Sequence, residues 1–256
     1  MTAAAPDRRL VRSGAAGAAL WRLGPPSSGP GAVVLLPGIE GDSRTFCRQT
    51  ALAEGLPLYS VDLPALDRIA AAAGALAPLL PSGPLLLVGA SFGGLVAREL
   101  VSSVEGRPVT LAALGALPAP HLRPAGLARR ARLVSVTPEA VFERLYRRRI
   151  GARLRGEAVP LEAAATHLRH LPTRDALAAR LRAVVAWRAP ASPPARAWWF
   201  RGQTDTEAPW SLAQAAAALP GVAVETLPGG HRPWLTHPGP LHAMVHALWR
   251  NTLSAR

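Results

Sequence analysis

Short apolar runs alternate with longer stretches of helical character through the first 120 residues of the chain. The runs are almost wholly apolar, are rich in Val and Leu, and are bounded by Pro or Gly, as buried strands often are. We predict such strands at residues 31–38, 56–64, 84–89 and 108–118, with helices between them at 42–55, 65–80 and 93–104. Apolar strands that alternate with helices indicate a parallel sheet with both faces covered.

The alternation stops near residue 120 and resumes near residue 195. In between, only helical stretches are found, at 138–150, 161–171 and 174–188. The chain then continues with a strand at 195–202, a helix at 210–219, a strand at 221–230 and a final helix at 240–253. A helical block between two strands of one sheet indicates an insertion rather than a separate domain. We therefore predict one α/β core, residues 1–120 and 191–256, that carries a helical insertion at residues 121–190.

Composition narrows the class of protein. Apolar residues make up 49% of the 256 residues, enough for a sizeable core. No apolar run approaches the roughly 20 residues of a membrane helix. The N-terminal stretch is short and interrupted by Arg12, so it does not resemble a signal peptide. We expect a soluble, cytoplasmic protein that does not act at a membrane.

Cysteine and histidine usage argues against a metal centre. Cys47 is the only cysteine, so neither an intrachain disulfide nor a cysteine metal cluster can form. His167 and His170, and likewise His242 and His246, have a spacing found among zinc ligands, but neither pair has a third ligand nearby. We interpret both pairs as packing or surface histidines, and we expect no metal ion and no cofactor.

A G-x-S-x-G pattern, GASFG at residues 89–93, lies between the apolar run LLLV and the predicted helix LVAREL. The pattern alone is weak evidence, but a serine at a sharp turn from strand to helix is typical of a nucleophile elbow. The turn strains the serine backbone, so only very small residues fit two positions to either side. The helix also directs free N–H groups to the reacting centre. We predict that Ser91 is a nucleophile and that Gly94 lets the helix pack closely; the alternative is a glycine-rich connection without chemistry.

A serine nucleophile needs a histidine base and a carboxylate that orients it. His231 follows the last predicted strand in the loop LPGGHRPW, whereas its nearest rival, His237, falls at the first turn of the final helix. Asp205 follows the strand WWFRG by a short loop, and Glu207 is the alternative acid. Asp62 also ends a strand but precedes the serine, and we interpret it as a carboxylate that stabilises a loop. We predict His231 as the base and favour Asp205 as the acid.

Two backbone N–H groups are needed to hold the negative charge that develops on a substrate carbonyl oxygen. Phe92, the residue after the serine, supplies one, and Ile39, in the loop after the first predicted strand, is the candidate for the other. Glu40 lies beside Ile39, where an unpaired carboxylate would oppose an oxyanion. We therefore expect Glu40 to point to solvent or to pair with an arginine.

These features occur in the order typical of one large family. The strand with Pro37-Gly38-Ile39, the strand end VDLP, the elbow at Ser91, Gly202-x-x-Asp205 and Gly230-His231 together resemble the α/β-hydrolase superfamily. The resemblance spans nearly the whole chain. It implies an α/β-hydrolase fold, with a mostly parallel sheet flanked by helices and a helical lid at residues 121–190. It further implies a Ser91–His231–Asp205 triad. The chain departs from the family at Pro37, where a histidine commonly precedes the glycine.

Charge is unevenly distributed along the chain. All 29 basic residues are arginines, and with 16 acidic residues they give a net charge of +13. Residues 121–190 hold 15 of the arginines but only five of the acids, and so carry +10 of that charge. The densest part contains Arg144, Arg147, Arg148 and Arg149. A solvated basic surface is one interpretation, and a surface that binds an anionic partner is the other.

The arginines do not indicate nucleic acid, because no recognition motif and no interleaved aromatic residues accompany them. An anionic acyl substrate or an acidic acyl carrier protein fits an ester-cleaving pocket better. We therefore predict a serine hydrolase that cleaves a carboxylic ester or thioester through an acyl-serine intermediate. The alternatives are an acyltransferase or a cofactor-free perhydrolase with the same triad, and a non-catalytic binding protein on this scaffold.

Overall fold

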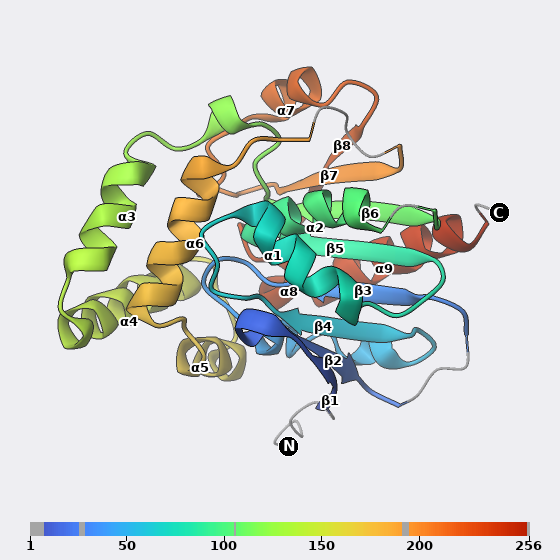
Figure 1. Ribbon diagram of the computed structural model, residues 1–256, viewed down its shortest axis with the longest axis horizontal. Helices are drawn as coiled ribbons and strands as arrows, with labels where there is room; N and C mark the ends of the chain where they lie inside the picture. The colour runs from blue at the N-terminus through green and yellow to red at the C-terminus, as the bar shows by residue number, and fades with distance from the viewer. Residues whose placement is uncertain (1–7, 26–28, 105, 191–194, 255–256) are drawn as a thin grey trace.

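The computed structural model describes residues 8–25, 29–104, 106–190 and 195–254, which build one eight-stranded sheet with helices on both faces (Figure 1). The strand order is β1-β2-β4-β3-β5-β6-β7-β8. Strands β3 to β8 run parallel to one another, and β2 is antiparallel to both β1 and β4. The strands are β1 (Arg8–Ser13), β2 (Ala19–Leu23), β3 (Ala32–Leu36), β4 (Leu58–Asp62), β5 (Leu85–Ala90), β6 (Val109–Leu114), β7 (Ala197–Gly202) and β8 (Ala223–Leu227).

The centre of the sheet is its most apolar part. Every residue of β3 and of β5 is buried, because helices cover both sheet faces and neither strand has a side that meets water. The six strands predicted from the sequence correspond, in order, to β3 through β8. The prediction of a parallel sheet covered on both faces is therefore confirmed.

The pattern of apolar residues does not reveal β1 and β2. Five of the six residues of β1 are exposed, since it is the edge strand, and its three arginines hide the periodicity. Contacts made in three dimensions hold the strands instead. The Arg8 guanidinium lies 3.5 Å from the centre of the Trp21 ring, and the Trp21 indole N–H donates to Asp62 Oδ2 at 2.6 Å. Pairing with neighbouring strands, and not the local pattern of apolar residues, therefore determines where β1 and β2 form.

The helix predicted at residues 42–55 is wrong. Two short 3₁₀ helices occupy this stretch, η2 (Ser43–Phe46) and η3 (Thr50–Ala53). Anchoring bonds to distant parts of the chain explain the break. The Ser43 backbone N–H and hydroxyl both donate to Asp62 Oδ1, at 2.9 and 2.5 Å, and the Gln49 amide donates to the Trp234 carbonyl oxygen at 2.6 Å. These bonds hold the chain in tight turns that a continuous α-helix would not satisfy.

The helices cover the two faces of the sheet and one of its ends (Figure 1). They are α1 (Ile69–Leu76), α2 (Phe92–Ser103), α3 (Leu127–Val136), α4 (Glu139–Gly156), α5 (Leu161–Arg169), α6 (Arg174–Ala186), α7 (Leu212–Ala218), α8 (Pro233–Thr236) and α9 (Pro238–Leu253). Helices α1 and α2 cover one face and α9 covers the opposite face (Figure 1). Each face thereby has its own apolar core. No helix in the described part of the chain is both long enough and apolar enough to span a membrane.

Helices α3 to α6, hereafter the α3–α6 segment (residues 127–186), connect β6 to β7 and lie together beyond one end of the sheet (Figure 1). A buried arginine of α2 holds the chain before and after this segment. Arg98 donates to the carbonyl oxygens of Pro118, at 2.9 Å, and of Pro190, at 3.4 Å. The predicted return of the chain to the sheet, from residue 191, begins at residues 191–194, outside the described residues.

Candidate active site

Ser91 lies at the turn between β5 and α2, where its backbone is strained. Its φ of +49° falls in the left-handed region, which residues with a side chain rarely adopt. A Cβ atom at Gly89 would lie 2.5 Å from the Gly94 Cα, and one at Gly93 would lie 2.3 Å from the Leu36 carbonyl oxygen. The turn therefore requires glycine at both flanking positions, and the absence of a side chain at Gly94 lets α2 approach β5, as predicted.

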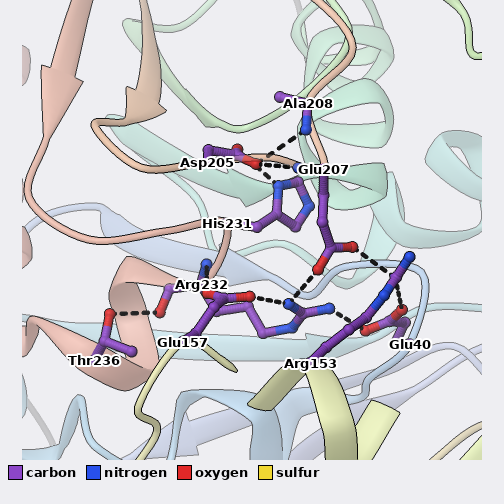
Figure 2. Close-up of polar contacts among 9 residues, drawn as sticks. All are labelled: Glu40, Arg153, Glu157, Asp205, Glu207, Ala208, His231, Arg232 and Thr236. Atoms are coloured by element: carbon purple, nitrogen blue, oxygen red, sulfur yellow. Dashed lines mark hydrogen bonds and ion pairs between the residues drawn. The ribbon is translucent and has the colours of Figure 1, made fainter. Parts of the chain in front are cut away.

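Asp205 and His231 come together from the loops after β7 and β8, neighbouring parallel strands whose carboxyl ends share one edge of the sheet. His231 Nδ1 lies 2.8 Å from Asp205 Oδ2 (Figure 2). The other oxygen, Oδ1, accepts the backbone N–H groups of Glu207 and Ala208 at 2.7 and 2.9 Å. Asp205 is only 3% exposed, so the carboxylate is held in one orientation beneath the imidazole.

The same contacts shift the pKa values of both groups. Burial by itself raises the pKa of the Asp205 carboxyl, but His231 and the two backbone N–H groups outweigh it and lower the pKa below the ordinary value. Burial likewise lowers the pKa of the His231 imidazole, but the hydrogen bond and the charge of Asp205 outweigh it and raise the pKa. Asp205 therefore stays ionised at neutral pH and stabilises a proton on His231.

The competing candidates make other contacts. Glu207 pairs with Arg153 and with Arg232, each at 2.6 Å, and not with the histidine. The Nδ1 atom of His237 lies 2.9 Å from the hydroxyl of the preceding threonine. Asp62 holds the η2 turn and β2, which confirms its interpretation as a carboxylate that stabilises a loop. Of the carboxylates and histidines weighed from the sequence, only Asp205 and His231 are bonded to each other.

Gly115, directly after β6, makes room for this pair. Its φ is +61°. A Cβ atom there would lie 3.0 Å from His231 Cε1, 3.1 Å from His231 Nδ1 and 3.5 Å from Asp205 Oδ2. Reasoning from the sequence missed Gly115. The available signal was a glycine placed directly after a buried strand, at the edge of the sheet where Ser91 was expected.

Ser91 and His231 line one cavity of about 910 Å³, together with Ile39 and Phe92. The cavity lies between the carboxyl ends of the strands and the α3–α6 segment, and residues from both line it. The backbone N–H groups of Ile39 and Phe92 donate to no other described residue. Both remain available to a group bound in the cavity.

The turn that carries Ile39 is held in place from α6. The guanidinium of Arg180, itself buried, donates to the carbonyl oxygens of Ile39 and Gly41, at 2.9 and 3.1 Å, and to that of Leu63 at 3.0 Å. These bonds attach α6 to the loops after β3 and β4. The sequence does not single out Arg180, because it is one of 15 arginines in residues 121–190 and its three partners lie more than 100 residues earlier.

A cluster of five charged side chains, the Arg232 cluster, joins three loops of the sheet to α4. Arg232, only 2% exposed, pairs with Glu40 and Glu207, each at 2.6 Å, and with Glu157 (Figure 2). Arg153 of α4 pairs with Glu207 at 2.6 Å and with Glu40 at 3.3 Å. Of the two arrangements expected for Glu40, pairing with an arginine is confirmed and exposure to solvent is not.

The Arg232 cluster keeps Glu40 and Arg232 charged inside the protein. Burial by itself raises the pKa of Glu40, but the charge and hydrogen bond of Arg232 lower the pKa to about 2. Burial lowers the pKa of Arg232, but its three carboxylate partners raise it above the ordinary value. The negative charge of Glu40, next to Ile39, is thus compensated by an adjacent cation.

The four arginines singled out on α4, Arg144, Arg147, Arg148 and Arg149, are all exposed. Arg147 donates to the Leu168 carbonyl oxygen at 2.9 Å. Arg149 differs from the other three because it also lines the cavity.

Arg130 of α3 lines the cavity together with Arg149, and neither side chain has an ion pair or hydrogen bond to another described residue. Burial, together with the positive charges of Arg130 and Arg153, lowers the pKa of Arg149. These arginines are close enough to repel one another. The sequence did not distinguish Arg130 from its neighbours.

The two histidine pairs with metal-like spacing do not build a metal site. Within the described residues, no group of three or more His, Cys, Asp or Glu side chains is placed to hold a metal ion. His170 Nδ1 lies 3.1 Å from Arg44 Nη1, and His242 is half-buried on α9. His167, in contrast, is buried and lines the cavity.

With the fold and this geometry established, the sequence can be compared with known proteins. Residues 12–243 match the alpha/beta hydrolase family. The chain belongs to this family. The match covers most of the sequence and, with the eight-stranded, mostly parallel sheet, confirms the predicted fold class. No curated protein matches the sequence.

Several solved structures resemble this alpha/beta hydrolase. An esterase from Thermogutta terrifontis, with malate bound, is 18% identical with a TM-score of 0.74, covering 96% of this chain and 99% of that one. A hydrolase from Pseudomonas aeruginosa PA01 is 16% identical, with a TM-score of 0.70 and coverages of 94% and 97%. The type II thioesterase from the borrelidin biosynthetic cluster is 20% identical, with a TM-score of 0.65 and coverages of 88% and 94%. At these identities the similarity is one of fold.

Proposed function

We propose that this protein hydrolyses carboxylic esters or thioesters through an acyl-serine intermediate. The observation that carries the proposal is the shared cavity: Ser91 lines it from a strained turn, and His231, bonded to the buried Asp205, lines it too. A nucleophilic serine needs a base and a carboxylate in this arrangement. Membership of the alpha/beta hydrolase family supports the proposal, and esterases and a thioesterase are among the similar structures.

In the first half of the reaction, Ser91 Oγ attacks the carbonyl carbon of the bound ester, and His231 Nε2 accepts the hydroxyl proton. Asp205 orients the imidazole through Nδ1 and stabilises its positive charge. The tetrahedral intermediate then collapses, and the alcohol or thiol leaves with the proton from Nε2. Water attacks the acyl-serine by the same route, which releases the acid and restores Ser91.

The N–H groups of Ile39 and Phe92 hold the oxyanion in both halves. Phe92 is the first residue of α2, where the helix presents its positive end. Arg180 steadies the turn that carries Ile39, and Arg232 compensates the adjacent charge of Glu40. A negative charge on the substrate oxygen is therefore stabilised by two N–H donors. The carboxylate of Glu40 does not oppose it, because its charge is compensated.

The α3–α6 segment acts as a lid, and its arginines favour an anionic substrate. Arg130 and Arg149 face the cavity without an acidic partner, so a carboxylate or phosphate on the substrate would supply the missing charge. Arg144 and Arg148 are exposed on α4 and would meet an acidic carrier protein that delivers an acyl group. The substrate class is therefore an anionic or carrier-linked acyl ester.

Labelling with a fluorophosphonate probe tests the nucleophile. The native protein should be labelled at Ser91 and should cleave members of a panel of acyl esters. Ser91→Ala should not be labelled and should lose about 10⁴-fold or more in kcat. Mass spectrometry locates the label and a titration of released acid follows cleavage. A native protein that is not labelled at Ser91, as expected for a non-catalytic binding protein, would overturn the proposal.

The molecule that accepts the acyl group distinguishes hydrolysis from acyl transfer and perhydrolysis. An acyltransferase passes the acyl group to an alcohol or amine, and a perhydrolase passes it to hydrogen peroxide, from the same acyl-serine. Analysis of the products with each acceptor added at millimolar concentration separates the three. Free acid as the main product in all mixtures is the expected result.

A further inference from the structure

A further polar group, a histidine, faces the cavity from the α3–α6 segment. His167 of α5 is 5% exposed and lines the cavity, and neither ring nitrogen has a hydrogen-bond partner among the described residues. Buried polar groups are nearly always hydrogen-bonded, and an imidazole left without a partner destabilises the fold. A buried histidine that opens on an active-site cavity can find its partner in a bound molecule.

Thr45 lies near His167, and the missing side chain of Gly41 makes room for the Thr45 hydroxyl. A Cβ atom at Gly41 would lie 1.9 Å from Thr45 Oγ1 and 3.6 Å from His167 Cε1. All three residues line the cavity, and the Thr45 hydroxyl makes no hydrogen bond to another described residue. We call this part of the cavity the His167 recess and define it by Gly41, Thr45 and His167.

The charges around the His167 recess indicate the chemistry of its ligand. Burial lowers the pKa of His167 to about 4, against the opposing effect of Glu40, and Arg232 and His170 lower it further. The imidazole is therefore neutral at pH 7, with one nitrogen that donates and one that accepts. The Thr45 hydroxyl also does both. The recess therefore offers a carboxylate or phosphate no cation of its own, whereas it matches a neutral group that both donates and accepts.

We propose that the His167 recess binds a hydroxyl group of the substrate, so that hydroxyl-bearing esters are preferred over their unsubstituted counterparts. A hydroxyl can donate to the accepting nitrogen of His167 and accept from the Thr45 hydroxyl, or the reverse. His167 and Thr45 are then residues that determine specificity, whereas Arg130 and Arg149 select for charge elsewhere in the cavity. The inference rests on the proposed ester hydrolysis and adds the kind of substituent that the cavity recognises.

Matched esters test the His167 recess. The substrates are methyl hexanoate and the methyl hydroxyhexanoates with the hydroxyl at carbons 2 to 6, and the readout is the ratio of kcat/KM for each hydroxylated ester to that of methyl hexanoate. The native protein should prefer at least one hydroxylated ester. In His167→Leu and in the nearly isosteric Thr45→Val, that ratio should fall roughly tenfold to 100-fold, because a buried hydroxyl would lose its partner. The activity on methyl hexanoate should change much less.

His242→Leu is the matched control, since it removes a half-buried histidine that does not line the cavity. It should leave the ratio unchanged, and thermal melting verifies that all variants are folded. A ratio at or below one in the native protein overturns the inference. So does a ratio that folded Thr45→Val retains in full.

Binding to Ser91→Ala separates this inference from the proposed hydrolysis. Calorimetry measures the Kd of the preferred hydroxylated ester, and of methyl hexanoate, in Ser91→Ala with and without Thr45→Val. If the native protein cleaves no ester but Ser91→Ala binds the hydroxylated compound more tightly in a Thr45-dependent way, the hydrolysis proposal fails and the His167 recess stands. If esters are cleaved and Thr45→Val changes neither Kd nor the kcat/KM ratio, the recess fails and the hydrolysis proposal stands.

Discussion

Ser91 has a backbone φ of +49°. In a residue with a side chain, this conformation costs about 1–3 kcal/mol. Glycine would relieve this strain but would also remove the hydroxyl. The flanking Gly89 and Gly93 allow the strained turn because any side chain there would collide with the backbone. The residue pattern therefore predicts the turn and the serine at its tip together, since both follow from the same steric requirement.

Replacing Asp205 by Asn tests the carboxylate beneath His231. The amide keeps the shape but not the charge, so the pKa of His231, which Asp205 raises, should fall. His231 must be neutral to accept the proton from Ser91. The kcat/KM of the native protein should therefore rise with pH through a midpoint above 6.5, and the midpoint of Asp205→Asn should be lower, with a loss of about 10⁴-fold in kcat.

Profiles of kcat/KM against pH measure both quantities. Asp62→Asn is the control, because Asp62 binds Ser43 and Trp21 and not the histidine. It should leave the midpoint in place. An unchanged midpoint in Asp205→Asn would show that Asp205 does not set the pKa of the catalytic base.

Three loops of the sheet meet the α4 helix in the Arg232 cluster. Glu40 lies in the loop after β3, Glu207 in the loop after β7 and Arg232 in the loop after β8, while α4 supplies Arg153, and Glu157 directly follows its last residue. Each loop also carries one member of the proposed catalytic set: the oxyanion turn, the acid or the base. The cluster therefore couples the position of the α3–α6 segment to the catalytic geometry.

Arg232→Met should lower the free energy of unfolding by about 3–5 kcal/mol, because the buried Glu40 and the half-buried Glu207 would keep only Arg153 as a cation and Glu157 would lose its ion pair. It should also lower kcat/KM, since the three loops lose their common partner. Urea unfolding at pH 7 measures the first effect. Arg148→Met, which removes an exposed arginine of α4, is the control and should cost less than about 1 kcal/mol. Equal stability of the two variants would contradict the prediction.

The sign of the pH effect follows from the lowered pKa of Glu40. A carboxyl whose pKa is lower in the folded than in the unfolded state contributes stability above its ordinary value of 4.5. That contribution is lost as the pH falls from 4.5 towards 2, where Glu40 takes up a proton. In Arg232→Met the pKa of Glu40 should rise towards its ordinary value, so this contribution should shrink and less stability should be lost as the pH falls below 4.5.

Over the whole molecule, positive charge is concentrated on one side of the cavity. Residues 121–190 carry +10 of the net +13, and they include helices that line the cavity. The sheet and its own helices are close to neutral by comparison. A field of one sign next to a cavity raises the rate at which oppositely charged molecules arrive, and salt weakens it.

Removing two exposed charges of α4 tests this field. The double variant Arg144→Gln/Arg148→Gln should lower kcat/KM for an acyl group on an acidic carrier protein by about three- to tenfold at low salt, because the association rate falls. The kcat/KM for an uncharged free ester should not change. The control is Arg9→Gln/Arg250→Gln, which removes the same charge from exposed positions outside this segment. An equal loss in both variants, or none in either, would contradict a carrier-binding surface on α4.

Prediction from the sequence succeeded where local pattern decides the outcome. The runs that became β3 to β8 are apolar enough to be buried wherever they lie, and the glycines around Ser91 permit one kind of turn. Prediction failed where a partner elsewhere in the chain decides the conformation. The arginine-rich β1 becomes a strand by pairing with β2, and residues 42–55 form 3₁₀ turns because Asp62 and the Trp234 carbonyl hold them.

By itself, the sequence determined the order of buried strands and helices, the strained turn at Ser91 and the concentration of charge in residues 121–190, because each depends on neighbouring residues or on composition. Only the tertiary structure decided which charges neutralise one another and which polar groups open on the cavity. Arg232 and Glu40 are 192 residues apart in the chain yet bond at 2.6 Å, and His167 meets Gly41 and Thr45 only when α5 lies over the loop after β3. Such contacts are made by folding, which buries each group against partners that no local pattern specifies.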